Sequence, residues 1–384
     1  MQTKTRDEHL FDEGPKRILA LDGGGIRGIL TLQILRRIEE LVRERTGNRK
    51  AVLSDYFDLI GGTSTGAIIA AALALGWDID RIDRVYRELG DSIFEDSLFR
   101  KGLFRAKFPT GPLEHALERE IGDVELGDPD ALKTGFAMVA KRLDTGSPWV
   151  LHNNPRGPFF DQQPGSGSVP NRQFKLRQIV RASTAAPTYF VPEKIEVADG
   201  VSGAFVDGGV SPHNNPSLQL LMLATLAGHG LNWNIGADQL LVVSLGTGSA
   251  EPRVSADKVM GMPAAALGIR ALSSLMDDAS ALNEQLMQWL STSPTARPID
   301  REVGDLGNDV LGGGAPWLTY LRYDVTLDRD WVKQRLGLDL DQRELDEVHA
   351  MDEPANMDSL ANIGAAAAAN LVANDHFPAG FDVA

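Results

Sequence analysis

The stretch that most constrains the fold is a short strand-like segment, a glycine-rich bend and a long apolar run in direct succession. Residues 56–60 (YFDLI) are short and mostly apolar, and residues 67–75 (AIIAAALAL) carry no polar side chain over a length typical of a buried helix. Between them, residues 62–66 (GTSTG) fit the G-x-S-x-G pattern. The sequence therefore predicts a strand, a tight turn and a buried helix, the local arrangement of an α/β protein.

The serine of this turn has two interpretations. A hydroxyl projects into a cleft from such a turn only if the backbone bends sharply, and the flanking Gly62 and Gly66 lack the Cβ atoms that would clash in the bend. The helix after Ser64 also directs free N–H groups at the turn, where they can stabilise a negatively charged oxygen. The alternative is a structural turn in which Ser64 or Thr63 caps the helix.

A second glycine-rich turn lies nearer the N-terminus. Residues 17–21 (RILAL) predict a buried strand, residues 22–28 (DGGGIRG) follow it, and an amphipathic helix then runs to a stop at Gly47. The G-x-G-x-x-G spacing fits a dinucleotide fingerprint, but the same N–H groups suit an oxyanion hole, and a turn without ligand is the third interpretation. A dinucleotide site expects an acidic residue at the end of the next strand. That strand ends at Ser64 instead, which favours the oxyanion hole.

Composition and charge exclude several classes of function. The 384-residue chain has no cysteine, so disulfides, cysteine catalysis and thiolate metal sites are excluded. Its 38 basic and 53 acidic residues give a net charge of −15, which disfavours nucleic acid as a partner and does not attract anionic membranes. No apolar run has membrane-spanning length, and residues 1–14 do not resemble a signal peptide. We therefore expect a cytoplasmic protein, with contact at a membrane surface as an open possibility.

A nucleophilic serine needs a base, and the histidines are poor candidates. None of the seven follows a strand as a triad histidine should, and His213 lies in a loop. Asp207 is better placed, because it ends a short predicted strand before two glycines that allow close approach of backbone or substrate. Carboxyl ends of parallel strands share one sheet edge, so this turn is expected to meet the other two in one crevice. An Asp-Gly-Gly turn without function is the alternative.

Three motifs in this order resemble the patatin-like phospholipase family of lipid acyl hydrolases. They are residues 22–28, 62–66 and 207–209, and two shorter stretches, residues 182–187 (ASTAAP) and 214–216 (NNP), resemble the family as well. The resemblance covers about residues 16–250. In that family a serine and an aspartate form a dyad that works without histidine, which accounts for the missing base.

The resemblance implies roles for residues of all three motifs. It makes Ser64 the nucleophile and Asp207 the base. It implies an oxyanion hole at the first loop, with the arginine nearby, formed by Gly23, Gly24, Gly25 and Arg27. The remaining motif glycines are Gly28, Gly62, Gly66, Gly208 and Gly209. Gly209 stands where many members have alanine, and His213 stands where many have a small or apolar residue, so the role of His213 is open.

The family also implies a fold and a division of the chain. The fold is α/β, with a mostly parallel central sheet sandwiched by helices, related to the α/β-hydrolase architecture. We expect residues 1–15 to be flexible and residues 16–250 to form the catalytic core. Residues 251–384 match the family weakly; their pattern predicts helices and an edge strand packed on the same domain.

The implied activity is phospholipase A-type hydrolysis through an acyl-enzyme on Ser64, without metal or cofactor. One alternative is the same chemistry gated by a cyclic nucleotide second messenger, as in a bacterial antiphage effector. Another is dinucleotide binding at the first glycine loop. The segment from Phe94 to Pro109 interleaves four phenylalanines with four cations, which predicts either peripheral membrane contact or packing on the core. The oligomeric state is not predicted.

Overall fold

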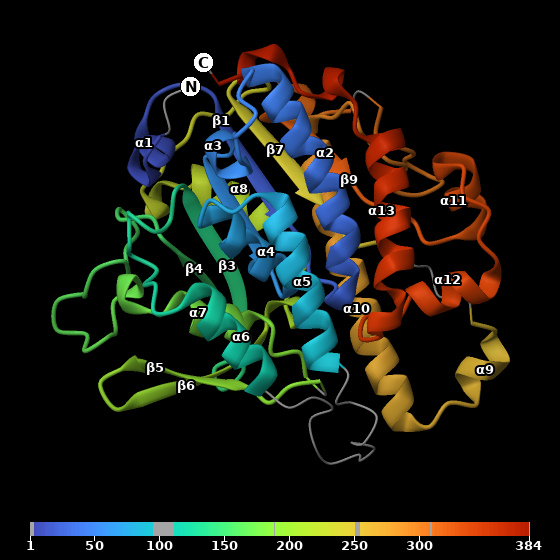
Figure 1. Ribbon diagram of the computed structural model, residues 1–384, viewed down its shortest axis with the longest axis horizontal. Helices are drawn as coiled ribbons and strands as arrows, with labels where there is room; N and C mark the ends of the chain where they lie inside the picture. Colours follow the sequence, from blue (N-terminus) through green and yellow to red (C-terminus); the bar gives the residue numbers. More distant parts are fainter. Residues whose placement is uncertain (1–3, 95–110, 188, 250–253, 308, 384) are drawn as a thin grey trace.

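The computed structural model describes residues 4–94, 111–187, 189–249, 254–307 and 309–383. Its strands are β1 (Lys16–Leu21), β2 (Leu59–Thr63), β3 (Gly135–Arg142), β4 (Ser147–His152), β5 (Glu193–Ala198), β6 (Val201–Asp207), β7 (Leu240–Leu245), β8 (Ser291–Thr292) and β9 (Leu318–Tyr323). Within the described residues they form one nine-stranded sheet in the order β5-β6-β3-β2-β1-β7-β9-β8, with β4 paired to β3. The sheet is mostly parallel and flanked by helices, which confirms the expected α/β class (Figure 1).

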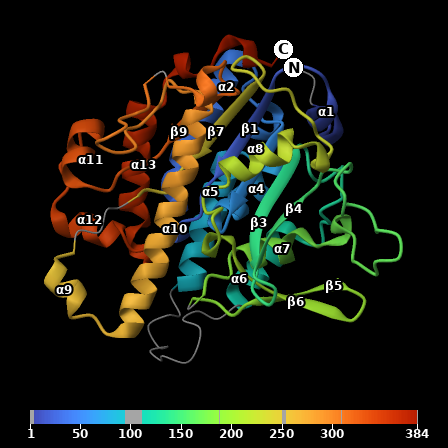
Figure 2. The same ribbon diagram turned by 180° about the vertical axis from the view of Figure 1, so that it is seen from behind.

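Helices cover both faces of the sheet. One face carries α2 (Gly28–Thr46), α4 (Thr65–Ala74), α5 (Ile79–Phe94) and α13 (Met357–Leu371), and the other carries α8 (Ser217–Thr225) and α10 (Ala264–Trp289) (Figure 2). The remaining helices are α1 (Arg6–Phe11), α3 (Leu53–Tyr56), α6 (Gly111–Ile121), α7 (Leu176–Ser183), α9 (Ala256–Met260), α11 (Arg329–Leu336) and α12 (Gln342–Val348). Because both faces are covered, the central strands β1 and β7 are buried at every residue, as their continuous apolar sequences predict.

The carboxyl ends of β2 and β6 meet head-on beside β3. β4 pairs with residues 137–142 of β3 and so occupies one edge of that strand. On the opposite edge β2 runs parallel to residues 135–139, and β6 runs antiparallel to residues 140–142. Thr63 therefore lies beside Val139, and Asp207 lies beside the next residue of β3. The last residue of β6 and the first residue after β2 are brought together by strand pairing.

This arrangement differs from the expected one in its strand directions. We expect all three motif turns to follow parallel strands, and the turns after β1 and β2 do so. Asp207, however, ends a strand that is antiparallel to its neighbour. β6 follows β5 through a hairpin with Gly200 in the left-handed region, but its antiparallel pairing with β3 is a long-range contact that these local residues do not encode.

Within residues 1–15, which we expect to be flexible, Arg6–Phe11 form the helix α1. His9 and Leu10 are buried, and His9 Nδ1 lies 2.9 Å from Asp58 Oδ1. Thr5 caps the helix in a capping box with Glu8, a sequence signal that predicts a helix start. The helix is too short for an apolar period to be visible, and its burial comes from tertiary contacts.

The edge strand expected in residues 251–384 corresponds to β9, of which the terminal strand β8 covers only Leu318 and Thr319. β9 lies between β7 and the two-residue β8, and all six of its residues are buried. Its polar positions, among them Arg322, are buried with partners rather than exposed to solvent. The alternation of polar and apolar residues along β9 therefore does not mark a solvent-exposed face, because the polar side chains are buried as well.

Two membrane-related points complete the fold. Within the described ranges, no helix combines the length and the apolar character that crossing a bilayer requires. Residues 95–110 lie outside the described residues, so membrane contact by the segment from Phe94 to Pro109 stays a prediction.

Candidate functional site

The serine turn between β2 and α4 has a strained backbone. Ser64 adopts φ 56° and ψ −127°, a region that residues with a side chain rarely occupy. A Cβ on Gly62 would lie 2.2 Å from the Gly66 carbonyl oxygen, and one on Gly66 would lie 2.3 Å from the Leu21 carbonyl oxygen. Both glycines are therefore required by the bend itself and by its packing against the end of β1.

A serine from α7 anchors this turn. The Ser64 N–H donates to Ser183 Oγ at 2.9 Å, and the Ser183 hydroxyl donates to the Val139 carbonyl at 2.6 Å. Ser183 is fully buried and belongs to the stretch 182–187 that resembles the family. The strained conformation is thus fixed through β3, the strand beside which β2 and β6 meet.

The Ser64 hydroxyl donates a hydrogen bond to Asp207 Oδ2 at 2.6 Å. The other carboxylate oxygen, Oδ1, accepts from the Gly209 N–H at 2.7 Å, and the Asp207 N–H donates to the Ala185 carbonyl at 3.0 Å. Across the described ranges, no histidine ring is hydrogen-bonded to Ser64 or Asp207. The pair therefore has the hydroxyl–carboxylate geometry of a dyad.

Burial tunes the carboxylate of this pair. Asp207 is 5% exposed, and burial raises its pKa to about 6, while the hydrogen bonds from Ser64 and Gly209 act in the opposite direction. The carboxylate is consequently ionised at pH 7 and is a stronger base than an exposed aspartate.

The first glycine loop lies directly against the serine. A Cβ on Gly23 would lie 2.9 Å from Ser64 Cβ and 2.6 Å from Asn214 Oδ1, so only glycine permits this approach. The Gly23 N–H donates to the Asn214 carbonyl at 3.3 Å, and the Gly24 N–H donates to Thr65 Oγ1 at 3.2 Å. Gly25 has φ 60°, and among the described residues no hydrogen bond engages its N–H.

Arg27 and Gly28 lie further from the dyad. Burial lowers the pKa of the Arg27 guanidinium, and the charges that oppose this effect are Asp324 and Asp277 rather than Asp207. A Cβ on Gly28 would lie 2.3 Å from the Tyr86 hydroxyl, which itself donates to the Gly25 carbonyl at 2.6 Å. Gly28 thus serves the packing that holds the loop.

The residues around Asp207 have mixed roles. A Cβ on Gly208 would lie 2.3 Å from the Val139 carbonyl oxygen, whereas one on Gly209 would meet nothing closer than 3.0 Å. The His213 carbonyl accepts from Thr63 Oγ1 at 2.6 Å, and burial lowers the pKa of the His213 ring. His213 therefore contributes its backbone to the site, and its ring has no place in the dyad.

Sequence reasoning missed several supporting residues. Asn214 and Ser183 lie in the stretches that resemble the family, so a signal for them existed. Asn283 of α10 had none: its Nδ2 donates to the Pro212 and Asn215 carbonyls at 2.7 and 3.1 Å, in the loop after Asp207. In the part of the chain that the structure describes, no group of three or more histidine, aspartate or glutamate side chains is arranged to hold a metal ion.

Comparison with known proteins places these features in a family context. The family model described as patatin-like phospholipase matches residues 19–221. A cGAMP-activated phospholipase of Vibrio cholerae serotype O1 is 33% identical over 220 residues, 55% of this chain and 57% of that protein. One of Escherichia coli strain TW11681 is 30% identical over 246 residues, 63% of this chain and 64% of that protein.

A plant relative has a different name. The probable inactive patatin-like protein 9 of Arabidopsis thaliana is 31% identical over 252 residues, 62% of each chain. The chain thus spans less than two thirds of the length of each of these three relatives. Since similarity extends to a protein described as inactive, similarity alone does not establish hydrolysis, and the geometry of Ser64 and Asp207 has to carry that conclusion.

Proposed function

Because the family model covers more than half of the chain, the chain belongs to the patatin-like phospholipase family, a hydrolase family, and we propose that it cleaves fatty-acyl esters of phospholipids. Ser64 is the nucleophile and Asp207 the base. The observation that carries the proposal is the 2.6 Å hydrogen bond from the Ser64 hydroxyl to Asp207 Oδ2, at a strained turn between strand and helix.

In the first half of the reaction, Asp207 accepts the proton of the Ser64 hydroxyl while the oxygen attacks the ester carbonyl. The carbonyl oxygen becomes an oxyanion, which needs N–H donors aimed at the position it then occupies. The loop of Gly23, Gly24 and Gly25 supplies them. Gly25 is the first choice because its N–H is not engaged by the described residues, and the Gly24 N–H joins when it exchanges Thr65 Oγ1 for the oxyanion.

The tetrahedral intermediate formed by this attack then collapses, and the ester C–O bond breaks. The proton on Asp207 passes to the departing alcohol oxygen, which leaves a lysophospholipid and an acyl group on Ser64. Asp207, ionised again, takes a proton from water, and the hydroxide attacks the acyl carbonyl. The fatty acid then leaves as the proton returns to Ser64 Oγ. A pKa near 6 suits Asp207 to both directions of proton transfer.

Two variants of the dyad test the proposal. Ser64→Ala and Asp207→Asn should each lower kcat by at least about 10³-fold on a p-nitrophenyl ester and on phospholipid vesicles, because each removes a reacting group. Thermal denaturation checks that each variant folds. Ser166→Ala, an exposed loop serine, is the matched control and should hydrolyse like wild type. Wild-type rates in Ser64→Ala or Asp207→Asn would refute the assignment.

A second candidate adds regulation to the same chemistry. Two relatives that are 33% and 30% identical are described as cGAMP-activated phospholipases, which supports a version in which a cyclic nucleotide activates hydrolysis. Vesicle hydrolysis should then rise at least tenfold when cGAMP is added. The same assay with other cyclic dinucleotides tests selectivity, and titration with NAD and NADP tests the dinucleotide alternative. Equal rates with and without every cyclic nucleotide would contradict gating.

A further inference from the structure

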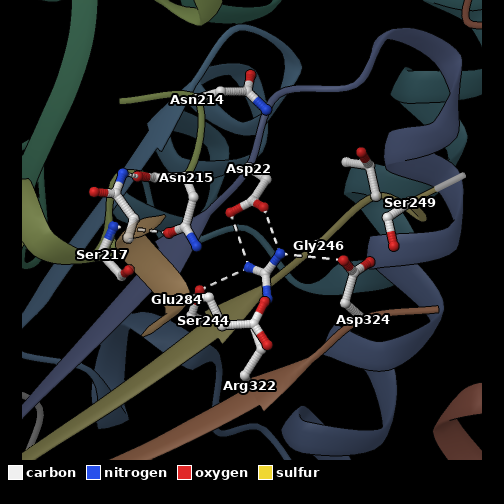
Figure 3. A network of polar contacts seen from close by, with 12 residues as sticks. Asp22, Asn214, Asn215, Ser217, Ser244, Gly246, Ser249, Glu284, Arg322 and Asp324 are labelled. Atoms are coloured by element: carbon white, nitrogen blue, oxygen red, sulfur yellow. Dashed lines mark hydrogen bonds and ion pairs between the residues drawn. The ribbon is translucent and has the colours of Figure 1, made fainter. Parts of the chain in front are cut away.

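A buried charge network lies behind the first glycine loop. Arg322 of β9 holds Asp22 with two contacts, Nη1 to Oδ1 at 3.1 Å and Nη2 to Oδ2 at 2.7 Å (Figure 3). Asp22 is the residue that opens the glycine loop, one position before Gly23, which lies against Ser64. Arg322, which lies outside the residues 19–221 that the family model matches, therefore binds the first residue of the glycine-loop motif.

The guanidinium of Arg322 is itself fixed from other sides. Nη1 donates to Ser244 Oγ at 2.8 Å, Nη2 lies 3.2 Å from Asp324 Oδ2, and Nε lies 3.6 Å from Glu284 Oε2. Each of these charged side chains is at most 7% exposed. Two carboxylates besides Asp22 thus keep the guanidinium in place. Burial acts to lower the pKa of Arg322, but the charges of Asp22 and Asp324 raise it, so the guanidinium stays charged.

Sheet register explains why these residues meet. Ala20 of β1 is paired with Ser244 of β7, which is paired with Arg322 of β9. Side chains in register point to the same face, and residues two apart along a strand share that face. Asp22, two residues beyond Ala20, therefore emerges on the face where Arg322 lies, two strands away.

We propose that Arg322, held by Asp324 and Glu284, is a positioning residue of the Ser64 site, which fixes Asp22 and through it the N–H groups of the glycine loop. This inference rests on the proposed function. It makes residues 251–384 part of the catalytic unit, in one domain with residues 16–250.

Three further hydrogen bonds hold the glycine loop of residues 22–28 in place. The Asp22 N–H donates to the Leu245 carbonyl at 3.0 Å, and Thr247 Oγ1 donates to the Gly23 carbonyl at 3.2 Å. The Ile26 N–H donates to the Met351 carbonyl at 2.9 Å. Residues that follow position 221 thus fix the glycine loop at its beginning and at its end. The Asp22 carboxylate is held in addition by an ion pair with Arg322.

α10 joins the two halves of the site. Asn283 bonds the loop after Asp207, and its neighbour Glu284 contacts both Arg322 and Arg297, the latter at 2.8 and 2.9 Å. Adjacent residues of one helix therefore touch the carboxylate turn and the network that holds the glycine loop. We therefore expect the position of α10 to affect both the loop after Asp207 and the charge network behind the glycine loop.

The experiment separates positioning from mere stability. Arg322→Lys keeps the charge but loses the two-point grip, and Asp22→Asn keeps the shape but loses the charge. A positioning role predicts a fall in kcat per reactive site, on the order of 10²-fold for Arg322→Lys, with KM unchanged. Reactive sites are counted by labelling Ser64 with a fluorophosphonate, so unfolded molecules do not enter the rate. Arg343→Gln, an exposed guanidinium paired with Glu347 in α12, is the matched control and should match wild type.

The outcomes are distinct. A lower kcat per labelled site in both variants supports the inference, and so does a slower labelling rate of folded protein. Wild-type kcat per labelled site in Arg322→Lys or Asp22→Asn overturns it, whatever their melting temperatures. A wild-type protein that neither hydrolyses esters nor labels at Ser64 instead refutes the proposed function.

Discussion

The tripeptide Asp-Gly-Gly occurs twice at the end of a strand, and the two copies have different partners. Asp22 and Asp207 are both 5% exposed, and burial raises the pKa of each to about 6. Asp22 is gripped by the guanidinium of Arg322, whereas Asp207 accepts only from the Ser64 hydroxyl and the Gly209 N–H among the described residues. The same local sequence therefore yields an anchor in one place and a candidate base in the other.

The difference originates in the neighbouring strands. Asp22 follows the central strand β1, and the next two strands of the sheet, β7 and β9, carry Ser244 and Arg322 in register with Ala20. Asp207 ends β6, which abuts the end of β2, so a serine turn faces it instead of a strand. A carboxylate that forms two hydrogen bonds with a guanidinium is held in one orientation. A carboxylate that accepts a hydrogen bond from a hydroxyl can also accept its proton.

The largest expected effect is the difference in kcat between variants of Asp207 and Asp22. Asp207→Asn removes the proton acceptor and should lower kcat by about 10³- to 10⁴-fold. Asp22→Asn leaves the acceptor in place and displaces the oxyanion donors, so we expect a loss of no more than about 10²-fold. Steady-state kinetics on a p-nitrophenyl ester measure both. Equal losses in the two variants would break the comparison, because they would assign both aspartates the same role.

The next prediction concerns the pH dependence of kcat/KM in the wild-type protein, which tests Asp207 as the base. Asp207 acts in its ionised form, and its pKa is raised to about 6, so kcat/KM should fall about tenfold per pH unit below that value. An exposed aspartate would place this fall near pH 4. Initial rates between pH 4.5 and 9, with thermal melts at each pH to exclude unfolding, test this. A flat profile down to pH 4.5 contradicts a buried aspartate as base.

The free energy of unfolding should change with opposite signs when the Asp207 carboxylate and the Arg322 cation are removed. The folded-state pKa of Asp207 lies above its unfolded value, so ionised Asp207 costs folding free energy, a cost that grows between about pH 4 and 6 and is complete above. Asp207→Asn should therefore stabilise the protein at pH 8 by about 1–3 kcal/mol, with no gain at pH 4. Arg322→Met should destabilise it by about 3–5 kcal/mol, because buried carboxylates lose their cation.

Chemical denaturation at pH 8 and pH 4 measures these free energies. Lys333→Met, which removes an exposed cation paired with Asp339, provides a control in the same part of the chain and should change stability little. Destabilisation by Asp207→Asn at pH 8 would mean that the Asp207 charge is compensated in the folded protein, and the contrast with Arg322→Met would be lost.

Local sequence predicted the three motif turns of the candidate site better than the residues that support them. Each motif turn is encoded by adjacent residues, so the strained turn at Ser64 and the position of Asp207 at a strand end follow from short-range rules. Arg322 carries no such signal, because its partner Asp22 is 300 positions away and the pairing depends on β9 lying beside β7. Its alternating neighbours predict an edge strand, but all six residues of β9 are buried.

Strand direction was equally beyond local rules. The meeting of β2 and β6 requires β6 to be antiparallel to β3, and nothing within Val201–Asp207 encodes its neighbour. The α1 helix shows the opposite failure: its capping box at Thr5 and Glu8 was present in the sequence, but its burial depends on Asp58. Long-range pairing, rather than propensity, limits what the sequence reveals here.

The smallest expected effect concerns the second glycine of each turn. A Cβ on Gly209 would lie 3.0 Å from Asn214 Oδ1 and 3.1 Å from Asp207 Oδ1, distances that small side-chain shifts relieve. A Cβ on Gly24 would lie 2.0 Å from Thr247 Oγ1, the hydroxyl that holds the Gly23 carbonyl. Gly209→Ala should therefore change stability by less than about 1 kcal/mol, whereas Gly24→Ala should cost about 1–3 kcal/mol through overpacking. Thermal melts and ester hydrolysis of the two alanine variants compare them directly, and a Gly209→Ala loss as large as that of Gly24→Ala would show that the catalytic turn is packed as tightly as the anchored one.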